Sequence, residues 1–134
     1  MKRWDLTALP SSTEKQTPRE PGADAPRVAR TEGDTPRVLF SEPECRTVVV
    51  DLAAGKTMGD HQVHERAVVL VAVGAVDVTA SDQTVTCPTG ALITFEPGER
   101  HAVRANEDSR LVLLLTPWTG DGHVPENAIV PPLR

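Results

Sequence analysis

The residues of this chain best suited to chemistry are its four histidines, His61, His64, His101 and His123. Imidazole binds metals and transfers protons near neutral pH. His101 opens a strand-like run after Pro97, and alternation along a strand places it on the same face as Val103. That face is apolar, so we expect His101 to point into the protein.

The face of His61 depends on how the chain runs after it. If 61–65 is an unbroken strand, His61, Val63 and Glu65 share one face. The opposite face would then carry Gln62, His64 and Arg66, a polar set that belongs in water. We therefore expect His61 and Glu65 to point inward and His64 to point outward.

Two inward imidazoles with a nearby carboxylate suit a divalent first-row metal such as Mn, Fe, Co, Ni or Zn. His61 and His101 are the first candidate ligands. Glu65, and His64 if a bulge reverses the parity after Val63, are weaker ones. An alternative needs no metal, because inward histidines also serve as hydrogen-bonded core groups or as polar groups in a ligand pocket.

The elements that must position these residues are short strands. Runs rich in Val, Leu, Ile and Thr alternate with turn residues, and no window shows a sustained helical stripe. The expected strands are 37–40, 46–52, 61–63, 67–73, 75–80, 83–87, 91–95, 101–105 and 110–116. The pattern predicts an all-β sandwich, jelly roll or barrel.

The prolines divide the chain into three parts. Twelve prolines are present, and many lie near the two ends of the chain. We expect 1–36 to form an extended or mobile arm, 37–117 to form the barrel and 118–134 to form an irregular C-terminal arm. The N-terminal arm carries too little apolar surface to fold alone.

Composition excludes several classes of function. The formal net charge is −5 and aromatic residues make up 3% of the chain, which does not suit a nucleic-acid binder. The longest apolar run, Ala67–Val76, is far shorter than the roughly 20 residues that span a bilayer. No secretory signal is visible, and Cys45 and Cys87 are expected to be reduced thiols. We expect a cytoplasmic protein that does not bind membranes.

The glycine and histidine spacing resembles the cupin superfamily over about Leu52 to Pro117. Gly55, His61 and Gly74 match the first cupin motif, whereas Gly90, Gly98 and His101 match the second. The resemblance implies a double-stranded β-helix, or jelly-roll, barrel and a homodimer, in which the N-terminal arm could add a strand to a partner and cover a strand edge.

The departures from the cupin motifs concern the ligands that the family uses to bind metal. Val63 stands where the family has its second histidine, and Ala67 where it has a glutamate. The asparagine of the second motif is replaced by Ala105, and Pro97 comes one position late. The resemblance therefore carries over only His61 and His101 as metal ligands.

Three functions remain open. The first is a barrel that binds a small organic ligand, with a weakly held divalent metal as an addition. The second, which the resemblance implies, is a metal-dependent isomerase, decarboxylase or dioxygenase acting on a small acid or sugar-like substrate. The third is a structural protein whose barrel is filled by side chains. The residues expected to line the pocket are His61, Val63, Glu65, Ile93, Phe95 and His101.

Overall fold

The computed structural model describes residues 1–11, 36–61, 64–118 and 130–133, without the side chains of Asp60 and His61. All regular structure in this part of the chain is β-strand. The strands are β1 (Arg37–Glu42), β2 (Cys45–Leu52), β3 (Thr57–His61), β4 (Arg66–Val73), β5 (Ala75–Ala80), β6 (Gln83–Pro88), β7 (Leu92–Phe95), β8 (His101–Ala105) and β9 (Ser109–Thr116). Over the described residues, no helix is long and apolar enough to cross a membrane.

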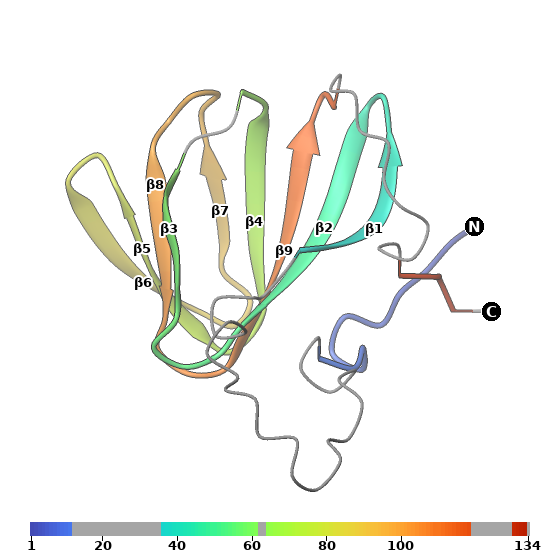
Figure 1. Cartoon of the computed structure of the whole chain (residues 1–134), viewed down its shortest axis with the longest axis horizontal. Coiled ribbons are helices and arrows are strands. Elements are labelled where there is room, and N and C mark those ends of the chain that lie inside the picture. Colours follow the sequence, from blue (N-terminus) through green and yellow to red (C-terminus); the bar gives the residue numbers. More distant parts are fainter. Residues whose placement is uncertain (12–35, 62–63, 119–129, 134) are drawn as a thin grey trace, which may run out of the picture.

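The strands form two antiparallel sheets that face each other (Figure 1). The larger sheet has the order β1-β2-β9-β4-β7, and the smaller sheet has the order β3-β8-β5-β6. Neighbours in both sheets are mostly distant in the chain, as in a jelly roll. The predicted all-β jelly-roll fold is confirmed.

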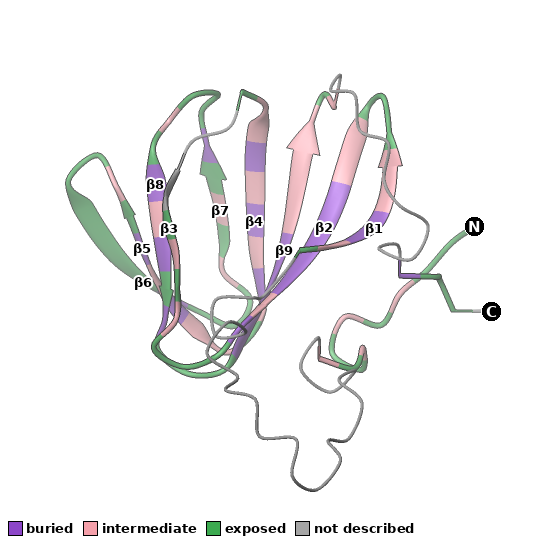
Figure 2. Cartoon of the chain, viewed as in Figure 1, coloured by how far each residue is buried: buried purple, intermediate pink, exposed green. Residues whose placement is uncertain are grey.

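The interior between the sheets is filled by one face of each strand. Along β4, buried Ala67, Val69 and Val71 alternate with half-buried residues, which gives the banded pattern of Figure 2. These side chains pack against inward-facing residues of the smaller sheet, including Val76 and Val103. The period of two in apolar residues is therefore the signal that builds the barrel.

The outer face of the larger sheet is also apolar and is covered by the chain itself. Val49 and Val112 of this face pack against Trp4 of the N-terminal segment and against Val130. The Trp4 Nε1 donates a hydrogen bond to the Val130 carbonyl oxygen at 2.8 Å. Residues near both ends of the chain thus lie on one face of the barrel, beside β1 and β2 (Figure 1).

A buried ion cluster lies on the same outer face. The Arg110 Nε donates to the Asp51 carboxylate at 2.7 Å, and Arg37 Nη2 donates to it at 2.9 Å. Arg110 Nη1 also donates to the Leu6 carbonyl oxygen at 2.8 Å. The cluster therefore ties β1, β2 and β9 to the N-terminal segment.

Eight of the nine predicted strands are confirmed with small shifts at their ends, but the third is wrong. The run 61–63 was expected, whereas β3 covers Thr57–His61. Its residues include Gly59 and Asp60, both of which are poor strand formers. Backbone pairing with β8 forms this strand in spite of its composition.

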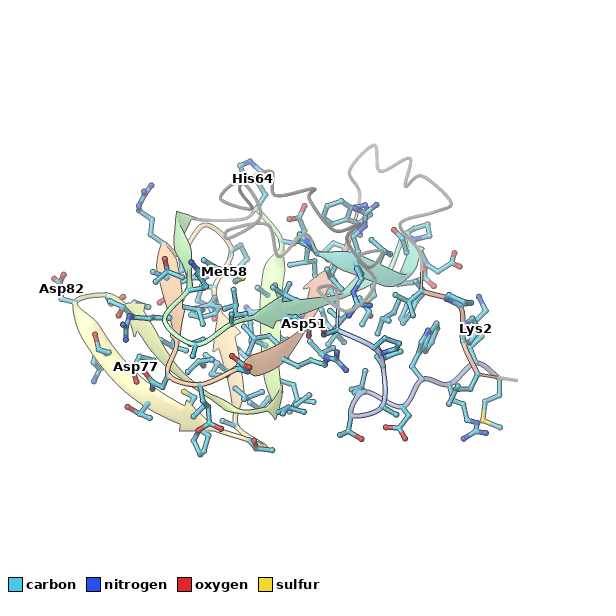
Figure 3. All side chains as sticks on the ribbon, turned by 60° about the horizontal axis from the view of Figure 1, so that its bottom comes forward. Lys2, Asp51, Met58, His64, Asp77 and Asp82 are labelled. Carbon is cyan, nitrogen blue, oxygen red and sulfur yellow. The ribbon has the colours of Figure 1, made fainter. Side chains whose placement is uncertain are left out.

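A tight hairpin joins β5 to β6. Ser81 and Asp82 have φ values of 52° and 61°. A two-residue hairpin with a type I′ turn requires positive φ at both central residues. The hairpin extends beyond the barrel, and Asp82 lies at its tip (Figure 3).

Gly74, between β4 and β5, lies close against the residues at the start of β9. Its φ is +96°, and a Cβ there would collide with Ser109 Oγ and lie 2.6 Å from the Asp108 carbonyl oxygen. We expect Gly74→Ala to lower the free energy of unfolding by about 2–4 kcal/mol, because strain and collision add. Urea denaturation measures this change.

The control for that experiment is Gly55→Ala. Gly55 has a φ of +85° but nothing within 4 Å of a Cβ, so the substitution adds conformational strain alone. We expect a loss of about 1–2 kcal/mol. Equal losses at the two positions would contradict the collision with Ser109.

Candidate functional site at the His101 end of the barrel

The register of the larger sheet aligns four inward-facing residues in one row. Arg46 pairs with Leu115, Leu115 pairs with Ala67, and Ala67 pairs with Phe95. The row crosses β2, β9, β4 and β7 near one end of the barrel. We call it the rim row.

The smaller sheet continues this row on the opposite side of the interior. His101 of β8 pairs with Ala80 of β5 and with His61 of β3. The pairing of β3 with β8 shifts between Met58 and His61, which marks a bulge or irregularity. Without that shift Asp60 would stand opposite His101, so the irregularity brings the two histidines into register.

The His101 ring joins the two sheets. His101 is 3% exposed, and its ring stacks on Phe95 with centroids 3.9 Å apart and an interplanar angle of 8°. Val103 and Ala105 follow it on the same buried face, as strand alternation predicts. The imidazole therefore lies inside the barrel, against an aromatic ring.

A backbone carbonyl determines the tautomer of His101. Its Nδ1 lies 3.0 Å from the Glu99 carbonyl oxygen. A carbonyl oxygen only accepts hydrogen bonds, so Nδ1 must carry the proton. In the neutral ring Nε2 is then the acceptor nitrogen, which is the atom able to bind a metal or a hydrogen-bond donor.

The turn between β7 and β8 holds that carbonyl in place. The Glu96 backbone N–H donates to Glu99 Oε1 at 2.9 Å, and the Glu99 N–H donates to the Glu96 carbonyl oxygen at 2.9 Å. Arg66 of β4 binds both carboxylate oxygens of Glu96, at 2.8 and 3.0 Å. This ion pair fastens the turn that carries His101 to the first residue of β4.

The interior becomes more exposed toward the His101 end. Val50, Val71 and Leu111, two rows farther in, are at most 1% exposed. The next row toward the His101 end includes Leu113 and Ile93, and the rim row includes Leu115. These three side chains also face inward but are only half-buried. In these two rows, half-buried side chains therefore stand beside buried ones such as Ala67, Phe95 and His101.

The structure places the other predicted site residues less favourably. The expected unbroken strand over 61–65 is wrong, because β3 ends at His61 and His64 and Glu65 form a bend. His64 is exposed and projects away from the barrel, whereas Glu65 is half-buried (Figure 3). Val63, His123 and the side chain of His61 lie outside the described residues.

The sequence match to known families agrees with this geometry. A family model described as a cupin domain matches residues 48–117, just over half of the chain. The chain belongs to the cupin family. No functionally curated protein is detectably similar to this cupin in sequence.

Solved structures share the fold of this cupin. A conserved Streptococcus pyogenes protein of unknown function is 24% identical, with a TM-score of 0.58 over 63% of this chain and 75% of that one. KdgF from a Halomonas species is 21% identical, with a TM-score of 0.59 over 61% and 78%. Clostridium difficile EutQ is 17% identical, with a TM-score of 0.57 over 63% and 68%.

The metal ligands of this cupin do not form a complete set in the part of the chain that the structure describes. No group of three His, Cys, Asp or Glu side chains there could hold a metal ion. Ala67, at the position of the cupin glutamate, is buried in the rim row and offers only a methyl group. Zinc and related metals bind tightly through three or four protein ligands, so the described residues do not fit a tight metal centre.

Sequence reasoning did not single out two residues at the β2 end of the rim row. Arg46 lies in the rim row, and its guanidinium carbon sits 4.1 Å from the centre of the Trp118 ring. Arg46 alternates with inward Val48, Val50 and Leu52, and this parity was a usable signal. Trp118 follows β9, and its place beside Arg46 has no local sequence signature.

A cavity of about 400 Å³ lies elsewhere on this cupin. It is lined by N-terminal residues such as Thr7 and Leu9 and by Asp51 and Arg110 of the outer ion cluster. None of the predicted pocket residues whose side chains the structure describes lines it. The cavity therefore belongs to the contact between the N-terminal segment and the outer face.

The Arg66–Glu96 pair gives the site a pH-dependent contribution to stability. The Arg66 guanidinium, through hydrogen bonding and its charge, lowers the pKa of Glu96 below the ordinary value of 4.5. A lowered pKa stabilises the folded state above pH 4.5, and this stabilisation is lost as the pH falls through the lowered value.

We expect Glu96→Gln to destabilise the protein at pH 7, with the difference from wild type shrinking below pH 4.5. Urea denaturation at a series of pH values measures it. Glu107→Gln, in the exposed turn before β9, is the control. A difference between wild type and Glu96→Gln that stays constant down to pH 2.5 would contradict a role for the ion pair.

Proposed function

We propose that this cupin binds a small organic ligand inside its barrel, at the His101 end. The observation that carries this proposal is the His101 imidazole, which is buried in an otherwise largely apolar row with Nε2 as its acceptor nitrogen. Ligand pockets combine mostly apolar walls with a few fixed polar groups, and the rim row has this character.

The packing around His101 supports binding over a purely structural role. Phe95 and the turn at Glu99 hold the ring in one orientation before any ligand arrives. Half-buried Ile93, Leu113 and Leu115 of the larger sheet add apolar surface to the interior. A preorganised polar group next to partly exposed apolar side chains favours binding, because little ordering is left to be done.

The binding proposal predicts that His101→Ala weakens the ligand about tenfold, since a buried hydrogen bond is lost. Ligand-observed NMR with a library of small organic molecules would identify ligands of the wild type, and titration would give their affinities. His64→Ala, which removes an exposed imidazole, is the matched control. Hits that bind His101→Ala and wild type equally would overturn the proposal.

A weakly held divalent metal is the second candidate. The observation that favours it is the register pair of His61 and His101, together with the proton on Nδ1 of His101. Two imidazoles with Ala67 in place of a glutamate would hold Mn, Fe, Co, Ni or Zn loosely. This candidate would allow metal-dependent isomerase, decarboxylase or dioxygenase chemistry on a small acid or sugar-like substrate.

The metal candidate predicts that protein purified without chelator retains a divalent metal, at up to one ion per chain. Elemental analysis should show this content falling in both His61→Ala and His101→Ala and unchanged in His64→Ala. A low content in the wild type that neither substitution alters would rule the metal candidate out.

We also propose that the chain forms a homodimer. The strands at the edges of the two sheets, β1, β7, β3 and β6, each pair on one side within the described chain. Unpaired strand edges favour association unless they are covered. The N-terminal arm, 1–36, is the proposed element of contact, and of this arm the structure describes 1–11 and 36.

The dimer proposal predicts that the full chain sediments at twice its mass of 14.4 kDa. A protein lacking residues 1–36 should sediment as a monomer. Trp4→Ala in the full chain is the control, because it loosens the packing on Phe40 and Val130 but keeps the arm. A monomeric full chain would contradict the dimer, and a dimer without the arm would remove the arm from this role.

A further inference from the structure

The outer face of the larger sheet is apolar over more of its width than the described terminal residues cover. One row of paired residues on this face runs from Val49 of β2 through Val112 and Leu70 to Leu92 of β7. Val49 is 0% exposed and Val112 is 4% exposed, whereas Leu70 is half-buried and Leu92 is 64% exposed. The row therefore stays apolar while its burial decreases from β2 to β7.

The neighbouring row on the same face shows the same change. Val68 of β4 pairs with Leu114 of β9 on one side and with Thr94 of β7 on the other. Val68 and Leu114 are half-buried, and Thr94 is exposed. We call the less covered part of the two rows the outer strip, which consists of Val68, Leu70, Leu92, Thr94 and Leu114.

The covered part of the face lies toward β1 and β2, beside the two ends of the chain (Figure 1). Trp4 and Val130 pack there in the cluster around Val49 and Val112, and Leu70 of the outer strip packs against the same cluster. Strand β7 lies at the opposite edge of the sheet, where its outward-facing residues are exposed (Figure 2). The outer strip therefore adjoins the terminal segments and continues beyond them.

The outer strip differs from a single exposed leucine, which is common on protein surfaces. Leu92 stands beside Leu70, and all residues of the strip are uncharged. The strip is bordered by the ion pair of Arg66 and Glu96, which strand alternation places on the same face. A continuous apolar surface with a polar border is typical of a protein contact site.

The lack of charge on the outer strip suits contact with a second copy of this chain. In a two-fold contact the same surface of each copy meets itself, so a charged surface would meet like charge. The chain carries a formal net charge of −5, and two copies repel each other over most of their surfaces. An uncharged apolar strip is a place where two copies can meet without burying like charges.

The area required for a stable contact connects the outer strip to the N-terminal segment. Specific interfaces take about 20–30 residues from each partner, and the strip consists of five. Half-buried Leu6 and Leu9 of the N-terminal segment lie on the same face and would enlarge the contact. The proposed dimer already assigns its contact to this arm, so the strip and the arm form one surface.

We propose that two copies of this chain pack their outer strips together in one two-fold contact, with the N-terminal segments beside them. This inference rests on the proposed homodimer and names its contact surface. Because the strip lies on the outer face, inward-facing side chains such as His101 and Ile93 take no part in the contact. The dimer contact and the ligand site are therefore separate surfaces.

Sedimentation equilibrium of the full chain tests this surface. We expect Leu92→Asp to raise the dissociation constant of the dimer about 100-fold, because each dimer would bury two unpaired carboxylates. Val85→Asp is the matched control, since Val85 is also an exposed aliphatic residue, at 52%, but lies on β6 of the smaller sheet. It changes the net charge equally and should leave the dissociation constant unchanged.

A second variant separates the contact from the overall charge. Leu92→Lys changes the formal net charge from −5 to −4 and so reduces the general repulsion between copies. It should still weaken the dimer about tenfold or more, because an ammonium group would be buried in the contact. Melting curves of each variant at low concentration verify that the chain is folded.

Hydroxyl-radical labelling of the wild type locates the contact without any substitution. We expect oxidation of the Leu92 side chain to decrease when the protein concentration is raised through the dissociation constant of the dimer. Oxidation of Val85 should stay the same over this range.

The outcomes separate this surface from the dimer itself. A dimer that neither Leu92→Asp nor Leu92→Lys weakens, or in which Leu92 is as reactive as in the monomer, would overturn the outer strip and leave the dimer proposal in place. Leu92 that is protected already in the dilute monomer would mean that the chain covers its own strip, which also overturns the inference. A full chain that is monomeric at every concentration would overturn both proposals, while the library screen with His101→Ala decides ligand binding separately.

Discussion

Strand β9 pairs with β2 on one side and with β4 on the other, so the larger sheet takes its register from a single central strand. Its residues Leu111 and Val112 are buried on opposite faces, one in the interior and one against the terminal segments. A shift of one residue in the register of β9 would move each of its side chains to the opposite face of the sheet. This double burial therefore determines which residues of β2, β4 and β7 form the rim row.

The polar groups of the barrel are positioned at the ends of strands, where packing is less restrictive. His101 follows a turn that is closed by Glu96 and Glu99 and is tied to β4 by Arg66. Arg46 is the first inward-facing residue of β2, and its guanidinium stacks on the ring of Trp118, which follows β9. These polar groups thus stand on the sheets, while adjoining loops set their orientation.

Much of the fold could be predicted because its signal is local. Alternation and turn residues predicted eight strands, and parity placed His101 with Val103 and Ala105 on the buried face. The third strand failed because Gly59 and Asp60 have little intrinsic preference for extended structure and are held by β8. The pairing irregularity there, which brings His61 opposite His101, depends on a partner forty residues away in the chain.

The sequence by itself determined the all-β class and the apolar lining of the interior, since both follow from the order of side chains along each strand. Tertiary structure decided which strand ends meet. Phe95 and His101, both expected in the pocket, stack across the turn between β7 and β8, whereas the stacking of Arg46 on Trp118 joins segments that no local pattern relates. Register across strands is set by long-range packing, and for that reason the candidate site emerges only when the two sheets are assembled.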